Sequence, residues 1–312
     1  MENSIKVVSI VGPTASGKTK LSVELAKHFN GEIVSADSMQ IYSGMQIATA
    51  KPTKAEMDGV PHHMMGFLPP DKTYSVASYV NDASKCIADI HSRGMLPFIV
   101  GGTGLYVDSL LNNISFSDDK RDEEYCSKLR KIGEEDGTDR LLDMLSEFDP
   151  ESAQRLRGGR NIKRIIRAIE FYKTTGKTIT EQIKESHNIP SPYSAVKLGL
   201  NCRDRQVLYD RINRRVDIML DEGLLEEAQR VINSELSYTS VKAIGYKELI
   251  PYFKGRKSLN DCVEKLKMET RRYAKRQITW FKRDTEINWI YIDEYNSFDE
   301  IYSQAKAIIE RG

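Results

Sequence analysis

The sequence has few cysteines, and their placement excludes two classes of small stabilised fold. The four, Cys86, Cys126, Cys202 and Cys262, lie far apart, with no CxxC pair and no paired histidines nearby. Zinc sites and disulfide frameworks need closer and more regular spacings. We therefore expect four reduced thiols and neither a structural zinc ion nor a disulfide scaffold.

The sequence also lacks any apolar run near the roughly 18 residues that a membrane-spanning helix needs. The stretch from Met1 to Lys6 shows no basic, apolar and small-residue pattern of a signal peptide. Both absences favour a cytoplasmic protein without membrane contact. The 312 residues are enough for one large α/β domain with a subdomain or for two modest domains.

An excess of charge of one sign is absent as well, because the formal net charge is only +1. The charges are nevertheless segregated: residues 117–147 are mostly acidic, with Asp118 and Asp119 near their start, whereas 155–173 and 267–283 are basic. Local basic faces on a neutral protein can bind a polyanion, although most charge runs are solvated helix faces.

Alternating strand-like and helix-like segments in the first hundred residues predict a parallel sheet. Residues 5–11, 32–36 and 97–100 have the β-branched, continuously apolar character of buried strands, and 17–29 and 75–93 have helical periodicity. Successive strand–helix–strand units form right-handed crossovers between parallel strands.

The alternation stops near residue 117, where a helical and heavily charged stretch begins. A strand at 197–202 is expected to rejoin the sheet. It is followed by helices at 204–221, 223–234 and 260–283, a strand at 288–292 and a helix at 298–311. We predict an α/β core, residues 1–116 and 195–312, interrupted by a helical insertion domain, residues 117–194.

A glycine-rich turn between the first strand and the first helix fits the pattern G-x-x-x-x-G-K-[ST]. Its backbone N–H groups and the following helix N-terminus can hold an anion, Lys18 adds a positive charge, and Thr19 offers a hydroxyl to Mg²⁺. The turn predicts a di- or triphosphate site and leaves open whether ATP binds there. Its residues are Gly12, Pro13, Thr14, Ala15, Ser16, Gly17, Lys18 and Thr19.

The strand at 97–100 argues against ordinary kinase or ATPase chemistry. Such enzymes add a Mg²⁺-binding carboxylate at a strand end, whereas this strand continues into Gly101 and Gly102. A diphosphate that serves as a leaving group needs the same glycine-rich turn.

A carboxylate, Asp37, follows the second predicted strand. Ligands of such sheets bind at the carboxyl ends of the strands, so Asp37 is expected in the same crevice as the phosphate loop. It could hold Mg²⁺ through water, accept a proton from a nucleophile, or simply cap a helix. Gln40, three residues later, suits the reading of an adenine edge.

Three segments together carry a resemblance to a known family: GPTASGKT at 12–19, SADSMQIY at 35–42 and VGGTGLY at 100–106. The segments 60–63, 161–168, 242–246 and 270–281 add to it. In this order, over nearly the whole chain, the set resembles the bacterial tRNA dimethylallyltransferase (isopentenyltransferase) family. The first segment alone is generic, but the set is specific. The zinc finger of the eukaryotic cytosolic branch is absent from the sequence.

The resemblance implies a P-loop NTPase-like core and a reaction. The donor is dimethylallyl diphosphate, and the acceptor is the N6 amine of the adenosine immediately 3′ of the anticodon in tRNA. Asp37 is implied as the general base, and Thr103 as a residue lining the channel where donor and base meet. Arg215 and residues 14–19 are implied to hold the diphosphate, with Mg²⁺ on Thr19. The family also suggests a monomer.

The predicted partner is the anticodon stem-loop of tRNA. The resemblance implies contacts at residues 37–40 and 161–165, and the basic stretches and the segment 242–246 extend the set. The predicted tRNA-binding residues are Asp37, Ser38, Met39, Gln40, Asn161, Ile162, Lys163, Arg164, Ile165, Arg167, Lys242, Gly245, Tyr246, Arg272, Lys275 and Arg276.

The sequence leaves open three alternatives to this function. A small-molecule P-loop kinase would need the missing carboxylate. An adenylate isopentenyltransferase acting on free AMP, ADP or ATP would not need two basic stretches. An RNA-binding protein without catalytic activity would not need Asp37, Lys18 and Thr19 together.

If the basic stretches bind tRNA, the affinity for tRNA should fall steeply with salt, because binding releases counterions from the phosphates. We expect a loss of about tenfold or more between 50 and 200 mM salt in a fluorescence-anisotropy titration. A flat salt response would contradict the assignment of these stretches to RNA.

Overall fold

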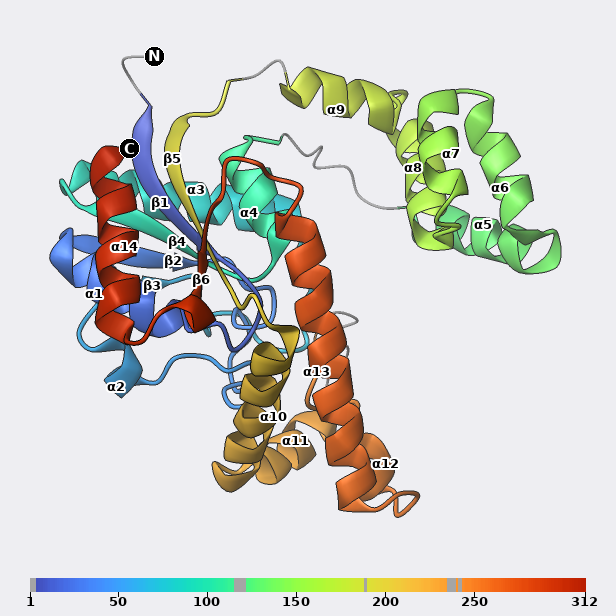
Figure 1. The fold of residues 1–312 in the computed structure, drawn as a ribbon. Coiled ribbons are helices and arrows are strands. Elements are labelled where there is room, and N and C mark those ends of the chain that lie inside the picture. Colours follow the sequence, from blue (N-terminus) through green and yellow to red (C-terminus); the bar gives the residue numbers. More distant parts are fainter. Residues whose placement is uncertain (1–3, 115–121, 188–189, 235–239, 241–242) are drawn as a thin grey trace. The chain divides into compact units, whose positions relative to one another are not determined.

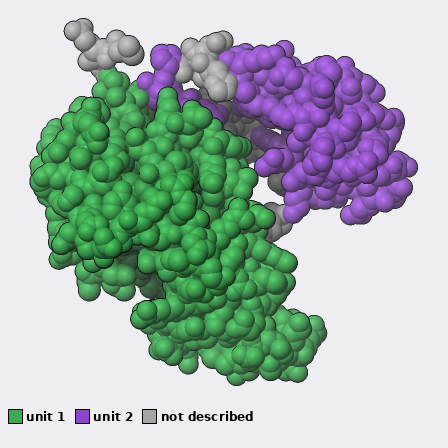
Figure 2. Space-filling model, viewed as in Figure 1, with its two compact units in different colours: residues 1–111, 192–312 green, residues 112–191 purple. Residues whose placement is uncertain are grey.

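The structure, a computed structural model, describes residues 4–114, 122–187, 190–234, 240 and 243–312. The chain divides into two units: residues 1–111 with 192–312, and residues 112–191 (Figure 2). The breaks therefore lie at 112 and 191, against the 117 and 194 expected from the sequence. Residue 117, together with Asp118 and Asp119, is outside the described residues.

A six-stranded sheet forms the centre of the first unit, and every neighbouring pair of strands in it is parallel (Figure 1). The prediction of a parallel P-loop NTPase-like sheet is confirmed. The order is β3-β2-β4-β1-β5-β6. The strands are β1 (Ile5–Val11), β2 (Gly31–Ser35), β3 (His62–His63), β4 (Leu96–Gly101), β5 (Tyr193–Asn201) and β6 (Asn288–Tyr291).

Helices cover both faces of this sheet, and each face has its own apolar core. The helices α3 (Val76–Ser92) and α4 (Gly104–Leu111) pack on one face with Phe281, the last residue of α13 (Leu259–Phe281). The helices α1 (Lys18–His28) and α14 (Phe298–Arg311) pack on the other. The remaining elements of this unit are α2 (Lys54–Met57), α10 (Arg205–Asp221), α11 (Leu224–Ile232), α12 (Ile250–Phe253) and a 3-10 turn η2 (Ile292–Glu294).

The long helix α13, expected at 260–283, buries one apolar face. Val263, Leu266 and Phe281 are buried, whereas Tyr273 is only partly so. Trp280 packs against the core of this face while partly exposed, and it donates its indole N–H to the Asp108 carboxylate at 2.7 Å.

The register of the strands brings three loops together at one edge of the sheet. Val11 lies opposite Gly101 of β4 and Gly199 of β5, and Ser35 lies opposite Val100. The segments that follow β1, β2 and β4 therefore begin side by side, as expected for the carboxyl ends of parallel strands.

Two glycines, the last residue of β4 and the first residue of α4, are required by close packing. A Cβ on Gly101 would lie 2.2 Å from the Ala36 carbonyl oxygen, and one on Gly104 would lie 2.1 Å from Cδ1 of Trp280. Neither position has room for a side chain unless its neighbour moves. The glycines of VGGTG thus let β2 and α13 approach β4 closely.

The second unit is a helical bundle with its own core. Its helices are α5 (Glu123–Glu135), α6 (Gly137–Ser146), α7 (Pro150–Arg157), α8 (Ile162–Thr175) and α9 (Ile179–His187). Leu129, Leu141 and Ile165 are among its fully buried residues. The buried Glu170 pairs with Arg167 and accepts a hydrogen bond from the Asp122 N–H at 3.1 Å.

Replacement of Gly104 by alanine should destabilise the first unit. The added Cβ would press on an indole ring that its bond to Asp108 holds in place. Such overpacking costs about 1–3 kcal/mol, and we expect it to exceed the helix-propensity gain of about 1 kcal/mol. The measurement is the urea denaturation midpoint. The matched control is Gly158→Ala, since a Cβ at Gly158 meets nothing within 4 Å; equal effects of both substitutions would contradict this account.

Candidate functional site

The loop between β1 and α1 has the backbone that its glycines make possible. Gly12 and Gly17 have φ of 146° and 90°, and Ala15 between them has φ of 63°. A Cβ on Gly12 would lie 2.3 Å from the carbonyl oxygen of Leu200 in β5. The loop is therefore pressed against the sheet edge and ends at the N-terminus of α1, where backbone N–H groups favour an anion.

Lys18 is folded back onto the loop that carries it. Its Nζ donates to the carbonyl oxygens of Gly12 at 3.0 Å and Pro13 at 2.7 Å. Burial, together with the nearby charge of Arg215, lowers the pKa of Lys18 to about 7, and Asp37 opposes this shift. A bound anion would favour the protonated amine, so anion binding is expected to take up a proton at this residue.

Two arginines of α10 reach the phosphate loop from the same helix face, four residues apart. Arg215, which the sequence predicted, makes long contacts to Thr14 Oγ1 at 3.4 Å and to the Ala50 carbonyl at 3.5 Å, and burial lowers its pKa. Arg211, which the sequence analysis missed, donates from Nε to the Ala15 carbonyl at 2.8 Å. Its position four residues before Arg215, on the same helix face, is the feature of the sequence that could have identified it.

Asp37 begins a turn directly after β2. Its Oδ1 accepts hydrogen bonds from the backbone N–H groups of Met39 at 2.9 Å and Gln40 at 3.4 Å. No described residue is hydrogen-bonded to its other oxygen, Oδ2. Burial raises the pKa of Asp37, while those N–H groups, Lys18 and Arg215 oppose the rise. A half-buried carboxylate with a raised pKa and one uncommitted oxygen is a candidate general base.

Thr103, at the end of the loop after β4, fixes this turn. Its hydroxyl accepts from the Ser38 N–H at 3.0 Å and donates to the Ser38 hydroxyl at 3.3 Å, while its own N–H donates to the Ala36 carbonyl at 3.0 Å. Tyr273 of α13 is hydrogen-bonded to Thr103 through its side chain, and burial raises the pKa of its phenol. The structure thus places Thr103 beside the turn of Asp37.

Gln40 has another role in the structure than reading an adenine edge. Its Oε1 accepts from the Ser35 hydroxyl at 3.2 Å, and its Nε2 donates to the carbonyls of Thr49 at 3.3 Å and Ala50 at 3.1 Å. Both ends of the amide are therefore engaged within the protein. Gln40 ties the Asp37 turn to the loop at 46–50, and its predicted base contact does not fit this arrangement.

The loop at 46–50 is anchored by a buried carboxylate that the sequence analysis missed. Glu227 of α11, 3% exposed, accepts from the backbone N–H groups of Gln46, Ile47 and Ala48, each at 2.9 Å. The hydroxyl of Tyr246 also donates to Glu227, at 2.9 Å. One acidic side chain therefore organises the loop whose carbonyls receive Gln40 and Arg215.

This anchor corrects two predicted tRNA contacts. Tyr246 is 2% exposed, and a Cβ on Gly245 would lie 2.6 Å from the Cβ of Ala48. Both residues support the loop from within and are not placed to touch an RNA. Lys242, predicted beside them, is outside the described residues.

Only some residues in the basic stretch of the second unit are exposed to solvent. Asn161 caps α8 by accepting from the Arg164 N–H at 3.3 Å, and Lys163 and Arg164 are exposed. Ile165 is fully buried in the core of that unit, and Ile162 packs partly against it, so the predicted contact of Ile165 with tRNA is wrong for its side chain. Arg167 is paired with Glu170.

The basic stretch of α13 is likewise reduced by internal pairing. Lys267 pairs with Asp217 at 2.8 Å, Arg271 donates to Asn213 Oδ1 at 2.6 Å, and Arg272 pairs with Glu269 at 2.8 Å. Lys275 and Arg276 are exposed one turn further along the helix. These two give α13 its clearest polyanion-binding positions.

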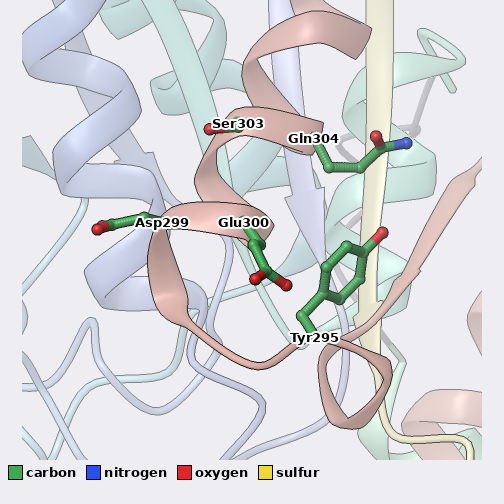
Figure 3. Close-up of a pocket in the computed structure, with 5 residues that line it drawn as sticks. All are labelled: Tyr295, Asp299, Glu300, Ser303 and Gln304. Atoms are coloured by element: carbon green, nitrogen blue, oxygen red, sulfur yellow. The ribbon is translucent and has the colours of Figure 1, made fainter.

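A surface hollow of about 460 Å³ lies elsewhere, beside the start of α14 (Figure 3). Tyr295, Asp299, Glu300, Ser303 and Gln304 line it. Ser297 caps this helix by accepting from the Glu300 N–H at 3.3 Å, and the Glu300 carboxylate accepts from the Asn296 N–H at 3.0 Å. None of the lining residues belongs to the phosphate loop or to the Asp37 turn, so this hollow is no candidate for the chemistry.

The site offers oxygen donors that suit Mg²⁺. Thr19 provides a hydroxyl in the first turn of α1, and Asp37 provides a carboxylate oxygen. The hydroxyl of Ser16, 1% exposed, has no hydrogen-bond partner among the described residues. Throughout the residues that the structure describes, no three His, Cys, Asp or Glu side chains are grouped so that they could hold a metal ion. Such sparse ligation fits a magnesium ion that takes most of its ligands from phosphate oxygens and water.

Comparison with known proteins agrees with this geometry. A family model described as IPP transferase matches residues 40–284, and one described as isopentenyl transferase matches residues 5–65. A tRNA dimethylallyltransferase from Caldanaerobacter subterraneus is 48% identical over 303 residues, which cover 96% of this chain and 95% of that protein. One from Bacillus cereus is 46% identical over 307 residues, covering 98% and 96%.

Two solved structures extend the likeness to the fold. The full-length tRNA isopentenylpyrophosphate transferase from Bacillus halodurans has a TM-score of 0.71 at 44% identity, covering 98% of this chain and 97% of that one. A eukaryotic dimethylallyltransferase, described as acting on tRNA, has a TM-score of 0.81 at 29% identity, covering 99% and 80%.

Binding of inorganic diphosphate should weaken as the pH rises above 7. The free site holds Lys18 with a pKa of about 7, and a bound anion raises that pKa, so above neutrality each binding event must take up a proton. We expect the Kd to increase about tenfold between pH 7 and 8.5 in isothermal titration calorimetry, with proton uptake seen across buffers. In the Lys18→Arg variant the guanidinium stays charged, so its Kd should depend less on pH. If the Kd of this variant rises as steeply with pH as that of the wild type, the assignment to Lys18 is contradicted.

Proposed function

We propose that the first unit of this chain, which belongs to the IPP transferase family, carries the catalytic site of a tRNA prenyltransferase. The reaction transfers the dimethylallyl group of dimethylallyl diphosphate to the N6 amine of the adenosine immediately 3′ of the anticodon, and releases diphosphate. The C1–O bond of the donor breaks, the C1–N6 bond forms, and one proton leaves the amine.

The phosphate loop supplies the leaving-group side of this reaction. Charge develops on the diphosphate as the allylic carbon separates from it. Arg215 and the amides at the start of α1 would meet that charge from where they stand, and Lys18 would join them once its Nζ turns from the carbonyls of Gly12 and Pro13 to the diphosphate. One preorganised donor of this kind is typically worth about 3 kcal/mol of transition-state stabilisation.

We propose that Mg²⁺ is bound with the diphosphate. The Thr19 hydroxyl would hold it, with phosphate oxygens and water as its other ligands. When bound, the ion neutralises charge on the diphosphate oxygens. The residues of the chain then retain two tasks, which are gripping the diphosphate and removing the proton.

Asp37 supplies the acceptor side. The lone pair of an adenine amine is delocalised into the ring, so the amine reacts well only when its proton is removed as the new bond forms. The uncommitted Oδ2 of Asp37 can accept that proton, and a positioned base of this kind contributes about 10²–10⁴-fold. Thr103 keeps the carboxylate in place through Ser38.

An adenosine stacked in an anticodon loop must be flipped out before it can react. We propose that exposed basic residues hold the flanking phosphates: Lys163 and Arg164 on α8, and Lys275 and Arg276 on α13. The substrate places the reaction in the cytoplasm, and the proposed working form is a monomer. None of the helices in the described part of the chain is long and apolar enough to cross a bilayer.

The single observation that carries this proposal is the proximity of Asp37 to the phosphate loop. Val11, just before the phosphate loop, and Ser35, two residues before Asp37, lie opposite the adjacent residues Gly101 and Val100 of β4, and Lys18 and Asp37 accordingly shift one another's pKa, so an acid–base group and an anion-binding amine share one site. A kinase-type carboxylate at the end of β4 is sterically excluded, because a Cβ on Gly101 would lie 2.2 Å from the Ala36 carbonyl oxygen. The proximity therefore favours group transfer from a diphosphate over phosphoryl transfer.

The test is an assay of the purified protein with Mg²⁺, dimethylallyl diphosphate and either unmodified tRNA or AMP, with nucleosides analysed by mass spectrometry. We expect prenylated adenosine from tRNA only. In Asp37→Asn, kcat should fall about 10²–10⁴-fold while diphosphate still binds, because only the base is lost.

Asp71→Asn is the matched control, since Asp71 is exposed and pairs with its neighbour Lys72. It should keep full activity. A product on AMP but not on tRNA, or phosphoryl transfer without prenylation, would contradict the proposed function.

A further inference from the structure

One buried amide in α13 connects the two halves of the site. Gln277 is 5% exposed. Its Oε1 accepts a hydrogen bond from the backbone N–H of Thr14 at 3.0 Å, and its Nε2 donates to the carbonyl oxygen of Gly102 at 2.9 Å. These partners lie 263 and 175 residues away in the sequence.

The first partner belongs to the leaving-group side. Thr14 lies in the phosphate loop, where Arg215 approaches its hydroxyl at 3.4 Å. Because Gln277 occupies the N–H of Thr14, that amide is not a donor to the diphosphate in this arrangement. It is instead the point at which the loop is fastened to α13.

The second partner belongs to the acceptor side. Gly102 directly precedes Thr103, whose hydroxyl holds the Ser38 N–H at 3.0 Å and thereby the turn that begins at Asp37. A Cβ on Gly102 would lie 2.0 Å from Gln277 Nε2, so any larger residue at position 102 would displace the Gln277 side chain. Ala274 and Phe281, on either side of Gln277 along α13, are also buried and fix the helix face.

We propose that Gln277 is a positioning residue that sets the separation between the bound diphosphate and the Asp37 carboxylate. It touches neither substrate. This inference rests on the proposed function, since it concerns the geometry of the same reaction. Prenyl transfer requires the diphosphate oxygen, the allylic carbon and the amine to be aligned, and a 1 Å misplacement can cost about 10²-fold in rate.

The chemistry of the two partners explains why this residue is an amide. The Thr14 N–H can only donate and the Gly102 carbonyl can only accept, so one side chain must do both. Methionine fills a similar volume but does neither. A glutamate carboxylate accepts from Thr14 but repels the Gly102 carbonyl, whereas a protonated glutamic acid can accept from Thr14 and donate to Gly102.

The experiment compares Gln277→Met and Gln277→Glu with the wild type, using steady-state prenylation of tRNA at pH 6 to 8. The active fraction of each protein is set by its stoichiometry of inorganic diphosphate binding. For both variants at pH 8 we expect kcat per active site to fall about 10–100-fold, with the KM for dimethylallyl diphosphate within about threefold of the wild type.

The kcat of the Gln277→Glu variant should recover at low pH. Protonation of its carboxyl restores the donor to Gly102, so the ratio of variant to wild-type kcat should rise about tenfold per pH unit until the acid is protonated. Taking the ratio removes the titration of Asp37, which both proteins share. Gln277→Met should show a flat ratio. The control Gln304→Glu places the same charge change on the exposed part of α14 and should match the wild type.

Each outcome separates the two hypotheses. A wild type that does not prenylate tRNA would refute the proposed function itself. An active wild type with variants of unchanged kcat per active site, or a Gln277→Glu ratio that does not depend on pH, would refute the positioning role alone. In that case Gln277 would serve only packing, and the variants would show a lowered melting temperature and active fraction.

Discussion

Everything at this site depends on how closely three loops meet at the carboxyl edge of the sheet. The Cβ positions of Gly12, Gly101 and Gly102 would lie 2.0–2.3 Å from Leu200, Ala36 and Gln277, so the phosphate loop lies against β5, the end of β4 lies against the end of β2, and the loop after β4 lies against α13. Such packing leaves little freedom for the groups they carry. It places a carboxylate from the end of β2 beside an anion-binding loop from the end of β1, which no single segment achieves alone.

The same packing removes Lys18, Arg215 and Asp37 from solvent together. Burial lowers the pKa values of Lys18 and Arg215 and raises the pKa of Asp37, while the opposite charges of Asp37 and the two cations partly offset these shifts. A diphosphate supplies the negative charge that the cations lack. The protein thus keeps its charges organised for a ligand and a developing leaving group rather than for its own stability.

The sequence predicted the sheet and indicated the candidate site residues because their signals are local. Continuous apolar runs marked β1, β2 and β4, the spacing of the glycine-rich turn marked Lys18 and Thr19, and the position directly after β2 marked Asp37. Contacts between distant segments carry no such signal. The clearest cases are Gln277, bonded to Thr14 across 263 residues, and Glu227, which anchors the loop at 46–50. The sequence motifs also do not reveal which of their residues are buried. The motifs therefore predict tRNA contacts for Tyr246 and Ile165, although both lie in apolar cores.

The most direct test of the account is a structure of the protein with a non-reactive thiolo analogue of dimethylallyl diphosphate and an anticodon stem-loop. The account predicts the diphosphate on residues 12–19, with Lys18 turned from its carbonyl partners to the phosphates. The adenine N6 should lie about 3–3.5 Å from the allylic carbon and within hydrogen-bond reach, about 3 Å, of Asp37. An adenine amine directed away from Asp37, with another group accepting its proton, would contradict the central claim.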